Sequence, residues 1–205
     1  MVNSYLQLLQ RRYGEKLDAE ADEMINYAVD GARRMQLMID DLMVYSRVHS
    51  RGRAFATVDS NAVVDDAIAK LDAAITQHKI QVTHDLLPAV RGDRNQLAEM
   101  WYRLLDNAVK FHGDDSPRIH ISATPSSGEC QFSVRDNGVG IDPKQADRVF
   151  LIFQRLHGST EYPGTGMGLP ICNRILDRHG GRIWHEPVEG GTIFHFTVPM
   201  PEDAE

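Results

Sequence analysis

The sequence Asp136-Asn137-Gly138-Val139-Gly140-Ile141-Asp142 decides the fold of this chain, together with a second glycine-rich stretch, Gly164-Thr165-Gly166-Met167-Gly168-Leu169. The first stretch follows the strand-like residues 130–135, and the second leads into a helix-like segment. One such stretch alone is a weak signal. Two of them in this order, preceded by Asn107-Ala108-Val109-Lys110-Phe111 at the end of an apolar helix, predict a nucleotide-binding site.

The first glycine stretch has the chemistry to recognise a purine base. The carboxylate of Asp136 can accept a hydrogen bond from an exocyclic amine such as that of adenine, and Gly138 and Gly140 leave room for the base against the backbone. A charge-assisted hydrogen bond of this kind contributes about 1.5–3 kcal/mol. The alternative is an Asp-Asn-Gly turn between two strands. Residues 141–150 look helical rather than strand-like, which favours the binding site.

Asn107 lies near the end of the helix predicted at 93–111, on a face shared with Arg103 and Lys110. Its amide carbonyl is a hard, neutral ligand that suits Mg²⁺, and Lys110 can bring a positive charge to a phosphate oxygen. Taken alone, Asn107 would be interpreted as satisfying a helix end, but the two glycine stretches favour binding. We expect Arg103 to pair with Glu99 one turn earlier; direct contact with a phosphate is the alternative.

The second glycine stretch is typical of a phosphate-binding loop. It lets backbone N–H groups approach an anion at the N-terminus of the following helix, where the helix dipole favours negative charge. Between the two stretches, Phe150 and Phe153 precede the polar segment 154–163. Aromatic anchors followed by a polar loop are typical of a lid that closes over a ligand. The alternative, that both phenylalanines pack in the core, is compatible with the lid.

Residues 2–48 look helical, with one break at Gly14, after which Asp18 can cap a second helix. The second helix carries a near-continuous heptad seam, formed by Ala21, Ile25, Ala28, Ala32, Met35, Ile39, Leu42 and Ser46. A lone hairpin exposes such a seam, so we expect a homodimer that buries it in a four-helix bundle. The alternative is that the seam packs on the rest of the same chain. The charged residues 47–53 are expected to form a linker.

The remaining pattern is mixed α/β. It predicts strands at 54–58, 80–86, 118–124, 130–135, 182–186 and 192–198, and helices at 60–78, 93–111 and 167–178. The 205 residues suffice for one sizeable core plus an appended element. The net charge of −7 argues against nucleic acid as a partner, and no apolar run is long enough to suggest membrane contact. Cys130 and Cys172 predict neither a disulfide nor a metal site, which suggests a cytoplasmic protein.

This ordered set resembles the ATP-binding catalytic domain of sensor histidine kinases of two-component systems, within the gyrase, chaperone and histidine kinase ATPase superfamily. The hairpin-like residues 2–48 are similar to the C-terminal part of the family's dimerisation and phosphoacceptor hairpin, so the resemblance covers nearly the whole chain. The matching motifs are the N box at 104–111, the first glycine box at 136–140, the F box at 150–157, the second glycine box at 164–168, and closing strands at 179–184 and 191–194.

The resemblance implies an α+β fold: a two-layer α/β sandwich of the Bergerat ATPase type, with a mixed sheet under three helices, preceded by an antiparallel helical hairpin. It divides the chain into a dimerisation hairpin at 1–50 and a catalytic domain at 51–205. The implied reaction passes the γ-phosphoryl group of ATP to a histidine of the dimerisation domain, with Mg²⁺, for relay to the receiver domain of a response regulator.

The resemblance also implies roles for single residues. Asp136 would recognise adenine, Asn107 would bind Mg²⁺, and Lys110 and the lid would hold phosphates; Asn107 and Lys110 are therefore the expected catalytic residues. The other expected nucleotide-binding positions are Gly138, Gly140, Phe153, Arg155, Gly164, Thr165, Gly166, Met167, Gly168 and Leu169.

Two features depart from the family. The phosphoacceptor lies in a His-Asp/Glu-Leu segment of the first hairpin helix, and residues 1–13 contain no histidine, so that segment is expected upstream of Met1. His84-Asp85-Leu86 imitates it but alternates like a strand, so we expect His84 to be a half-exposed strand residue and the chain not to phosphorylate itself. Arg103 stands where the family often has Asn. Both departures leave a second function open, a non-catalytic nucleotide-binding or dimerisation module that regulates another kinase.

Overall fold

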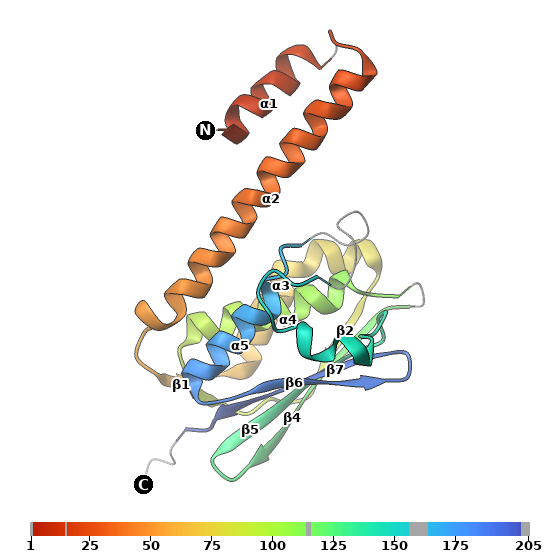
Figure 1. Cartoon of the computed structure of the whole chain (residues 1–205). Helices are drawn as coiled ribbons and strands as arrows, with labels where there is room; N and C mark the ends of the chain where they lie inside the picture. Colours follow the sequence, from red (N-terminus) through yellow and green to blue (C-terminus); the bar gives the residue numbers. More distant parts are fainter. Residues whose placement is uncertain (1, 15, 114–115, 156–163, 202–205) are drawn as a thin grey trace. The chain divides into compact units, whose positions relative to one another are not determined.

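The computed structural model describes residues 2–14, 16–113, 116–155 and 164–201 (Figure 1). The chain divides into two compact units, Met1–Met43 and Val44–Glu205. The first unit holds helix α1 (Val2–Tyr13) and most of helix α2 (Ala19–Ser50). The second unit holds the last turns of α2 and all the strands.

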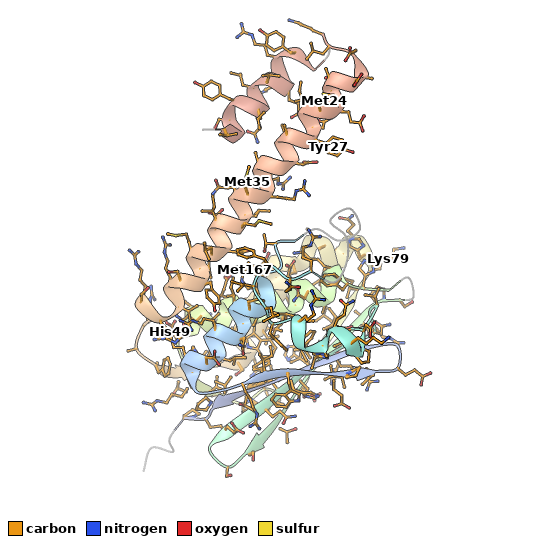
Figure 2. The ribbon with its side chains drawn as sticks, in the orientation of Figure 1. Met24, Tyr27, Met35, His49, Lys79 and Met167 are labelled. Carbon is orange, nitrogen blue, oxygen red and sulfur yellow. The ribbon has the colours of Figure 1, made fainter. Side chains whose placement is uncertain are left out.

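In the first unit, α1 and α2 form the predicted helical hairpin. The Gly14 N–H closes α1 on the Gln10 carbonyl at 2.9 Å, and Asp18 caps α2 by accepting from the Ala21 N–H at 2.9 Å, as predicted. The Gln10 side chain bonds Asn26 across the hairpin at 2.6 Å. Many large apolar side chains remain exposed along both helices, and Met24, Tyr27 and Met35 project from α2 in Figure 2.

The helix α2 continues further than predicted. Residues 47–50, assigned to a linker by their charge, are helical, and the Arg51 N–H still bonds the Arg47 carbonyl at 3.0 Å. The physical reason is Val48, which is 3% exposed and belongs to the core of the second unit. One buried valine in a charged run holds this turn against the domain. The prediction was therefore wrong for the first half of the linker.

The second unit is built on a mixed five-stranded sheet, as predicted, in the order β2-β4-β5-β7-β6. Strand β2 pairs parallel to β4, and the other neighbours pair antiparallel. The strands are β2 (Gln81–His84), β4 (Arg118–Ser126), β5 (Glu129–Asp136), β6 (Ile183–Val188) and β7 (Gly191–Pro199). A separate antiparallel pair joins β1 (Ala56–Val58) to β3 (Val90–Gly92). Strand β3 was not predicted, because it is short and is formed by pairing with β1, a segment more than 30 residues earlier in the chain.

Three helices, α3 (Ser60–His78), α4 (Arg94–Lys110) and α5 (Gly168–His179), lie together on one face of the sheet (Figure 1). Asp93 caps α4, as predicted, by accepting from the Asn95 and Gln96 N–H groups at 3.1 and 3.4 Å. A short 3-10 helix, η1 (Pro143–Arg148), occupies the segment predicted to be helical after the first glycine stretch. The two-layer α/β sandwich expected from the sequence is thus present.

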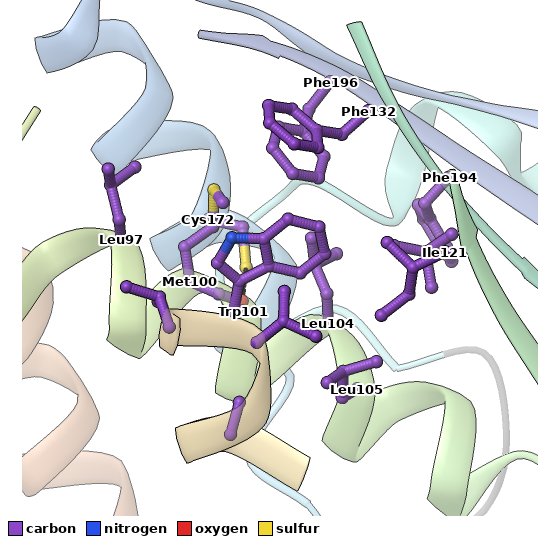
Figure 3. Packing of buried hydrophobic residues seen from close by; sticks show 14 of the residues in the cluster. Leu97, Met100, Trp101, Leu104, Leu105, Ile121, Phe132, Cys172, Phe194 and Phe196 are labelled. Carbon is purple, nitrogen blue, oxygen red and sulfur yellow. Dashed lines mark hydrogen bonds between the residues drawn. The ribbon is translucent and has the colours of Figure 1, made fainter. Parts of the chain in front are cut away.

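The core lies between the helices and the sheet (Figure 3). Trp101 of α4 meets Phe132 and Phe196 edge-on, with ring centroids 5.5 and 5.0 Å away, and those two rings stack at 5.1 Å. Cys130 and Cys172 are buried free thiols, and burial raises their pKa to about 11 and about 12. Because this packing fixes one face of α4, it also fixes the polar face that carries Asn107.

Candidate nucleotide-binding site

The first glycine stretch lies directly against the end of α4. The Val139 N–H donates to the Phe111 carbonyl at 3.0 Å. A Cβ atom added at Gly138 would come within 2.2 Å of the same carbonyl oxygen, so a side chain would force the two segments apart. Glycine at this position therefore brings the residues after β5 to the helix that carries Asn107.

Asp136 ends β5 at the edge of this junction. Its Oδ1 accepts from the Gly138 N–H at 2.9 Å, which fixes the orientation of the carboxyl group. Burial raises the pKa of Asp136, and hydrogen bonds from the backbone of Gly138 and Thr192 oppose that rise. A carboxylate that is partly desolvated and held in place is suited to accept one strong hydrogen bond from a ligand.

A cavity of about 520 Å³ flanks the same glycine stretch on the side of the β6–β7 hairpin. It is lined by Gly138, Val139, Gly140, Ile141, Asp142, Pro143, Gln145, Pro187, Val188, Gly190 and Gly191. This lining contains two of the predicted binding residues, Gly138 and Gly140, and leaves out Asn107 and Lys110 on α4.

The second glycine stretch brings the start of α5 to Asn107. A Cβ atom added at Gly168 would lie 3.7 Å from both amide atoms of Asn107, so that side chain stands beside the first residue of α5. Gly166 has a φ of +74°, and a Cβ there would come within 2.6 Å of the Gln154 carbonyl oxygen. The glycines thus join the N-terminus of α5 to the metal-ligand candidate on one side and to the F box on the other.

Other predicted positions of this stretch have different surroundings. Met167 is fully buried in the core, at 0% exposure, so its side chain does not face a ligand, and Leu169 packs against the same core. The pattern of alternating glycines in the sequence does not indicate that the Met167 side chain is buried. Thr165 accepts from the Met167 N–H at 3.3 Å and so orders the loop, and Gly164 is exposed.

The charged residues of α4 form two ion pairs along one face. Arg103 Nε donates to Glu99 Oε1 at 2.7 Å, as expected from their spacing. Lys110 Nζ donates to Asp106 Oδ2 at 2.5 Å. Asp106 was not singled out as a site residue, although its spacing of four from Lys110 was visible in the sequence. The Lys110 charge is therefore already balanced by a neighbour.

The two phenylalanines of the F box have different surroundings. Phe150 packs against the core, whereas Phe153 is 44% exposed and has a φ of +60°. Arg155 is half-buried. Most of the predicted lid, residues 156–163, lies outside the described residues. His84 ends β2 with 26% of its side chain exposed, and its Nε2 lies 3.2 Å from Asp65 Oδ1, so the prediction of a half-exposed strand residue is confirmed.

Similarity to known proteins agrees with this geometry. Residues 92–202 match the family described as histidine kinase-, DNA gyrase B-, and HSP90-like ATPase. Cyanobacterial phytochrome A of Nostoc sp. (strain PCC 7120) is 46% identical over 97% of this chain and 26% of its own length. The phytochrome-like protein Cph1 of Synechocystis sp. (strain PCC 6803) is 43% identical over 97% of this chain and 27% of its own length. The chain thus spans about a quarter of these curated relatives.

Solved structures show the same fold. The catalytic domain of histidine kinase ThkA is 26% identical, with a TM-score of 0.64 over 72% of this chain and 96% of its own. A longer ThkA structure, in complex with response regulator protein TrrA, is 22% identical, with a TM-score of 0.69 over 97% of this chain and 57% of its own. The chain therefore belongs to the histidine kinase-, DNA gyrase B- and HSP90-like ATPase family and carries an ATP-binding catalytic domain of the sensor histidine kinase type.

Proposed function

We propose that this chain is the catalytic region of a two-component sensor histidine kinase. Residues 1–50 would be the dimerisation hairpin and residues 51–205 the catalytic domain. The domain would transfer the γ-phosphoryl group of ATP to a histidine of a dimerisation hairpin, and a response regulator would then receive it. The family match at residues 92–202 supports the catalytic segment. The curated relatives support both segments, since the similarity to cyanobacterial phytochrome A covers 97% of this chain.

The observation that carries the proposal is the meeting of three segments at the ends of α4 and α5. Gly138 and Val139, which follow Asp136, lie against the Phe111 carbonyl, and Asn107 lies beside Gly168. We assign adenine recognition to Asp136 and phosphate binding to Lys110 and the N-terminus of α5, where the helix dipole favours an anion. Arg155, Phe153 and the second glycine stretch would complete the phosphate end of the site.

The residues present also fit a magnesium ion. Asn107 offers a neutral amide oxygen beside a helix N-terminus, which is the hard type of ligand that Mg²⁺ takes while keeping waters and binding phosphates. Among the described residues, no group of three or more His, Cys, Asp or Glu could hold a metal by itself. We therefore assign the ion to Asn107 and the nucleotide. Bound there, it would neutralise charge on the phosphates.

The protein's contribution to the reaction is mostly positioning. A neutral histidine nitrogen would attack the γ-phosphorus, the bond to the β–γ bridging oxygen would break, and ADP would leave. Lys110 and the backbone N–H groups of α5 would stabilise the charge on the transferring group. For Lys110 to do so, its amine must leave Asp106, to which it is bonded at 2.5 Å.

Two kinds of protein partner are proposed for this chain, a second copy of itself and a response regulator. Met35 and Ile39 of the predicted seam are 57% and 56% exposed, as a homodimer interface would need before assembly. The complex of ThkA with TrrA supports a response regulator receiver domain as the downstream partner. No helix among the described residues has the length and apolarity to cross a bilayer. We place the protein in the cytoplasm, with no nucleic-acid or membrane partner for this segment.

A thermal melt with and without MgATP tests the proposal. At a ligand concentration of about 100 times Kd, binding should stabilise the fold by about 2.7 kcal/mol. Asp136→Asn should lose about half of that shift or more while it remains folded. If MgATP did not change the melting temperature of the wild type, or changed that of Asp136→Asn equally, the proposal that nucleotide binds through Asp136 would be wrong.

A second candidate function is a non-catalytic module that binds nucleotide and regulates another kinase. The observation that favours it is the Arg103–Glu99 ion pair at 2.7 Å, one turn before Asn107, where the family often has Asn. Incubation with γ-labelled ATP and a purified histidine-bearing hairpin from a relative separates the two. Label on that hairpin supports the kinase, and ATP binding without label supports the module. Acid-labile, alkali-stable label on this chain itself would contradict the expectation that it does not phosphorylate itself.

A further inference from the structure

A cluster around Arg178 joins three segments that are far apart in the sequence. Arg178 Nη1 donates to Gln96 Oε1 at 2.7 Å and to Asp93 Oδ2 at 3.3 Å. Its Nη2 donates to the Arg53 carbonyl at 2.7 Å. Asp93 caps α4 and Gln96 lies in its first turn. Arg178 lies in the last turn of α5, and Arg53 lies in the linker 51–55 that follows α2. We call Arg178, Asp93 and Gln96 the linker clamp.

The other two members of the clamp also hold the linker and the end of α2. Asp93 Oδ2 accepts from the Arg53 N–H at 2.6 Å, and Gln96 Nε2 donates to the Val48 carbonyl at 2.7 Å. Asp93 is 2% exposed and the Arg178 side chain 16% exposed. The guanidinium therefore neutralises a buried carboxylate, and its removal would leave that carboxylate with backbone N–H donors but without the Arg178 countercharge.

Phe55 of the linker packs against the same guanidinium. Arg178 Cζ lies 4.8 Å from the centroid of the Phe55 ring, and Phe55 stacks on His179 with ring centroids 4.5 Å apart. A Cβ atom added at Gly52 would come within 2.1 Å of Arg178 Cζ. Glycine at position 52 is thus what lets the chain pass over Arg178, and a larger residue there must push the guanidinium away.

The clamp and the proposed nucleotide residues occupy opposite ends of the same two helices. In α4, Gln96 lies in the first turn and Asn107 in the last; in α5, Gly168 comes first and Arg178 lies in the last turn. The helices pack together along their length, with Cys172 Sγ 3.7 Å from the Met100 carbonyl oxygen. A ligand that bridges Asn107 and Gly168 would therefore contact α4 and α5, the same two helices that the linker clamp joins.

We propose that Arg178 is a positioning residue that couples the linker after α2 to nucleotide occupancy. This inference rests on the proposed binding of MgATP between the ends of α4 and α5. A shift of either helix on binding alters the spacing between Asp93, Gln96 and Arg178, and so alters how firmly the linker is held. Such coupling is reciprocal: the factor by which MgATP strengthens the clamp is the factor by which loss of the clamp weakens MgATP binding.

Hydrogen exchange at the Arg53 amide reads the clamp directly, because that N–H donates to Asp93. In the wild-type chain, saturating MgATP should slow this exchange by about fivefold or more. In Arg178→Gln the exchange should be faster without nucleotide, MgATP should no longer slow it, and the Kd for MgATP should rise by the factor lost. Arg94→Gln is the matched control, since it removes one exposed arginine that pairs with Asp66 outside the clamp.

Gly52→Ala provides an independent variant, because it displaces the guanidinium without deleting it and should reproduce Arg178→Gln. It also serves if Arg178→Gln does not fold. If MgATP binds the wild type but Arg53 exchange is unchanged, or if both clamp variants keep the wild-type Kd, the coupling is wrong and the proposed function survives. If MgATP does not bind the wild type at all, the proposed function fails and this inference fails with it.

Discussion

At the scale of the residue, the function that we propose for Asp136 opposes stability. The Gly138 N–H orients its carboxylate, yet burial disfavours the charge of that carboxylate and raises its pKa. A raised folded-state pKa means that the stability linked to this group is fully present below the unfolded pKa and is lost as pH rises through the folded value. Ionisation of this buried carboxylate therefore costs stability, as is common for groups at binding sites.

Asp136→Asn should therefore change stability and binding in opposite directions. The amide can still accept from Gly138 and carries no charge to desolvate, so the variant should melt higher than the wild type at pH 7, with the difference shrinking toward pH 3. Loss of the charge-assisted bond, about 1.5–3 kcal/mol, should weaken ATP binding by roughly tenfold or more. Melts over a pH series and titration with ATP measure both. If the melting temperature of Asp136→Asn minus that of the wild type were lower at pH 7 than at pH 3, the prediction would be contradicted.

Asp106 makes a second prediction at this scale. Its carboxylate competes with a phosphate for the Lys110 amine, so Asp106→Asn should tighten ATP binding. Half-exposed pairs of this spacing contribute only about 0.3–0.5 kcal/mol, which corresponds to roughly a twofold lower Kd. Glu99→Gln, which breaks the other ion pair of α4, is the control and should leave Lys110 unaffected. Weaker binding by Asp106→Asn would assign that carboxylate to the site itself.

At the scale of the element, glycines decide how the helix ends meet the loops. A Cβ at Gly138 would clash with the Phe111 carbonyl at 2.2 Å, whereas a Cβ at Gly168 would make an ordinary 3.7 Å contact with Asn107. Gly138→Ala should therefore lower the melting temperature and weaken ATP binding together. Gly168→Ala should keep the fold and weaken ATP binding, because its methyl group stands beside the proposed metal ligand. Equal melting temperatures for the two variants would contradict the clash.

The elements themselves were largely predictable from the sequence. Helix α4 had a clear cap at Asp93 and the long strands a clear alternation, and these predictions are confirmed. The elements that the sequence did not predict are short or depend on contacts between segments that are far apart in the chain. Strand β3 has only three residues, and the last turn of α2 is held by Val48 in a core formed from segments distant in the chain. Local patterns do not contain such contacts.

The sequence indicated which segments of the candidate site would meet, and said less about the surroundings of each residue. The structure brings the first glycine stretch to the end of α4 and Gly168 beside Asn107, because close backbone approach depends on residue type. The inward position of Met167 and the pairing of Lys110 with Asp106 depend on packing and on competing partners. The linker clamp joins residues 53, 93 and 178, and no local pattern could indicate it.

At the scale of the whole molecule, the exposed seam of α2 predicts self-association. Met35 and Ile39 are more than half exposed, at 57% and 56%, and stand at seam positions. We expect sedimentation to give a dimer for the wild type and a monomer for Met35→Glu with Ile39→Glu, with ATP affinity unchanged, since these residues lie outside the catalytic unit. A monomeric wild type, or a dimer that survives both substitutions, would remove the hairpin as the dimer interface.

The central claim is that the first glycine stretch and the facing ends of α4 and α5 enclose one nucleotide. A crystal structure with a non-hydrolysable ATP analogue and Mg²⁺ tests it most directly. The account predicts the adenine amine on the Asp136 carboxylate, the metal on Asn107, and the phosphates at Gly168 within reach of Lys110. An analogue bound elsewhere, or one with its base turned away from Asp136, would contradict it.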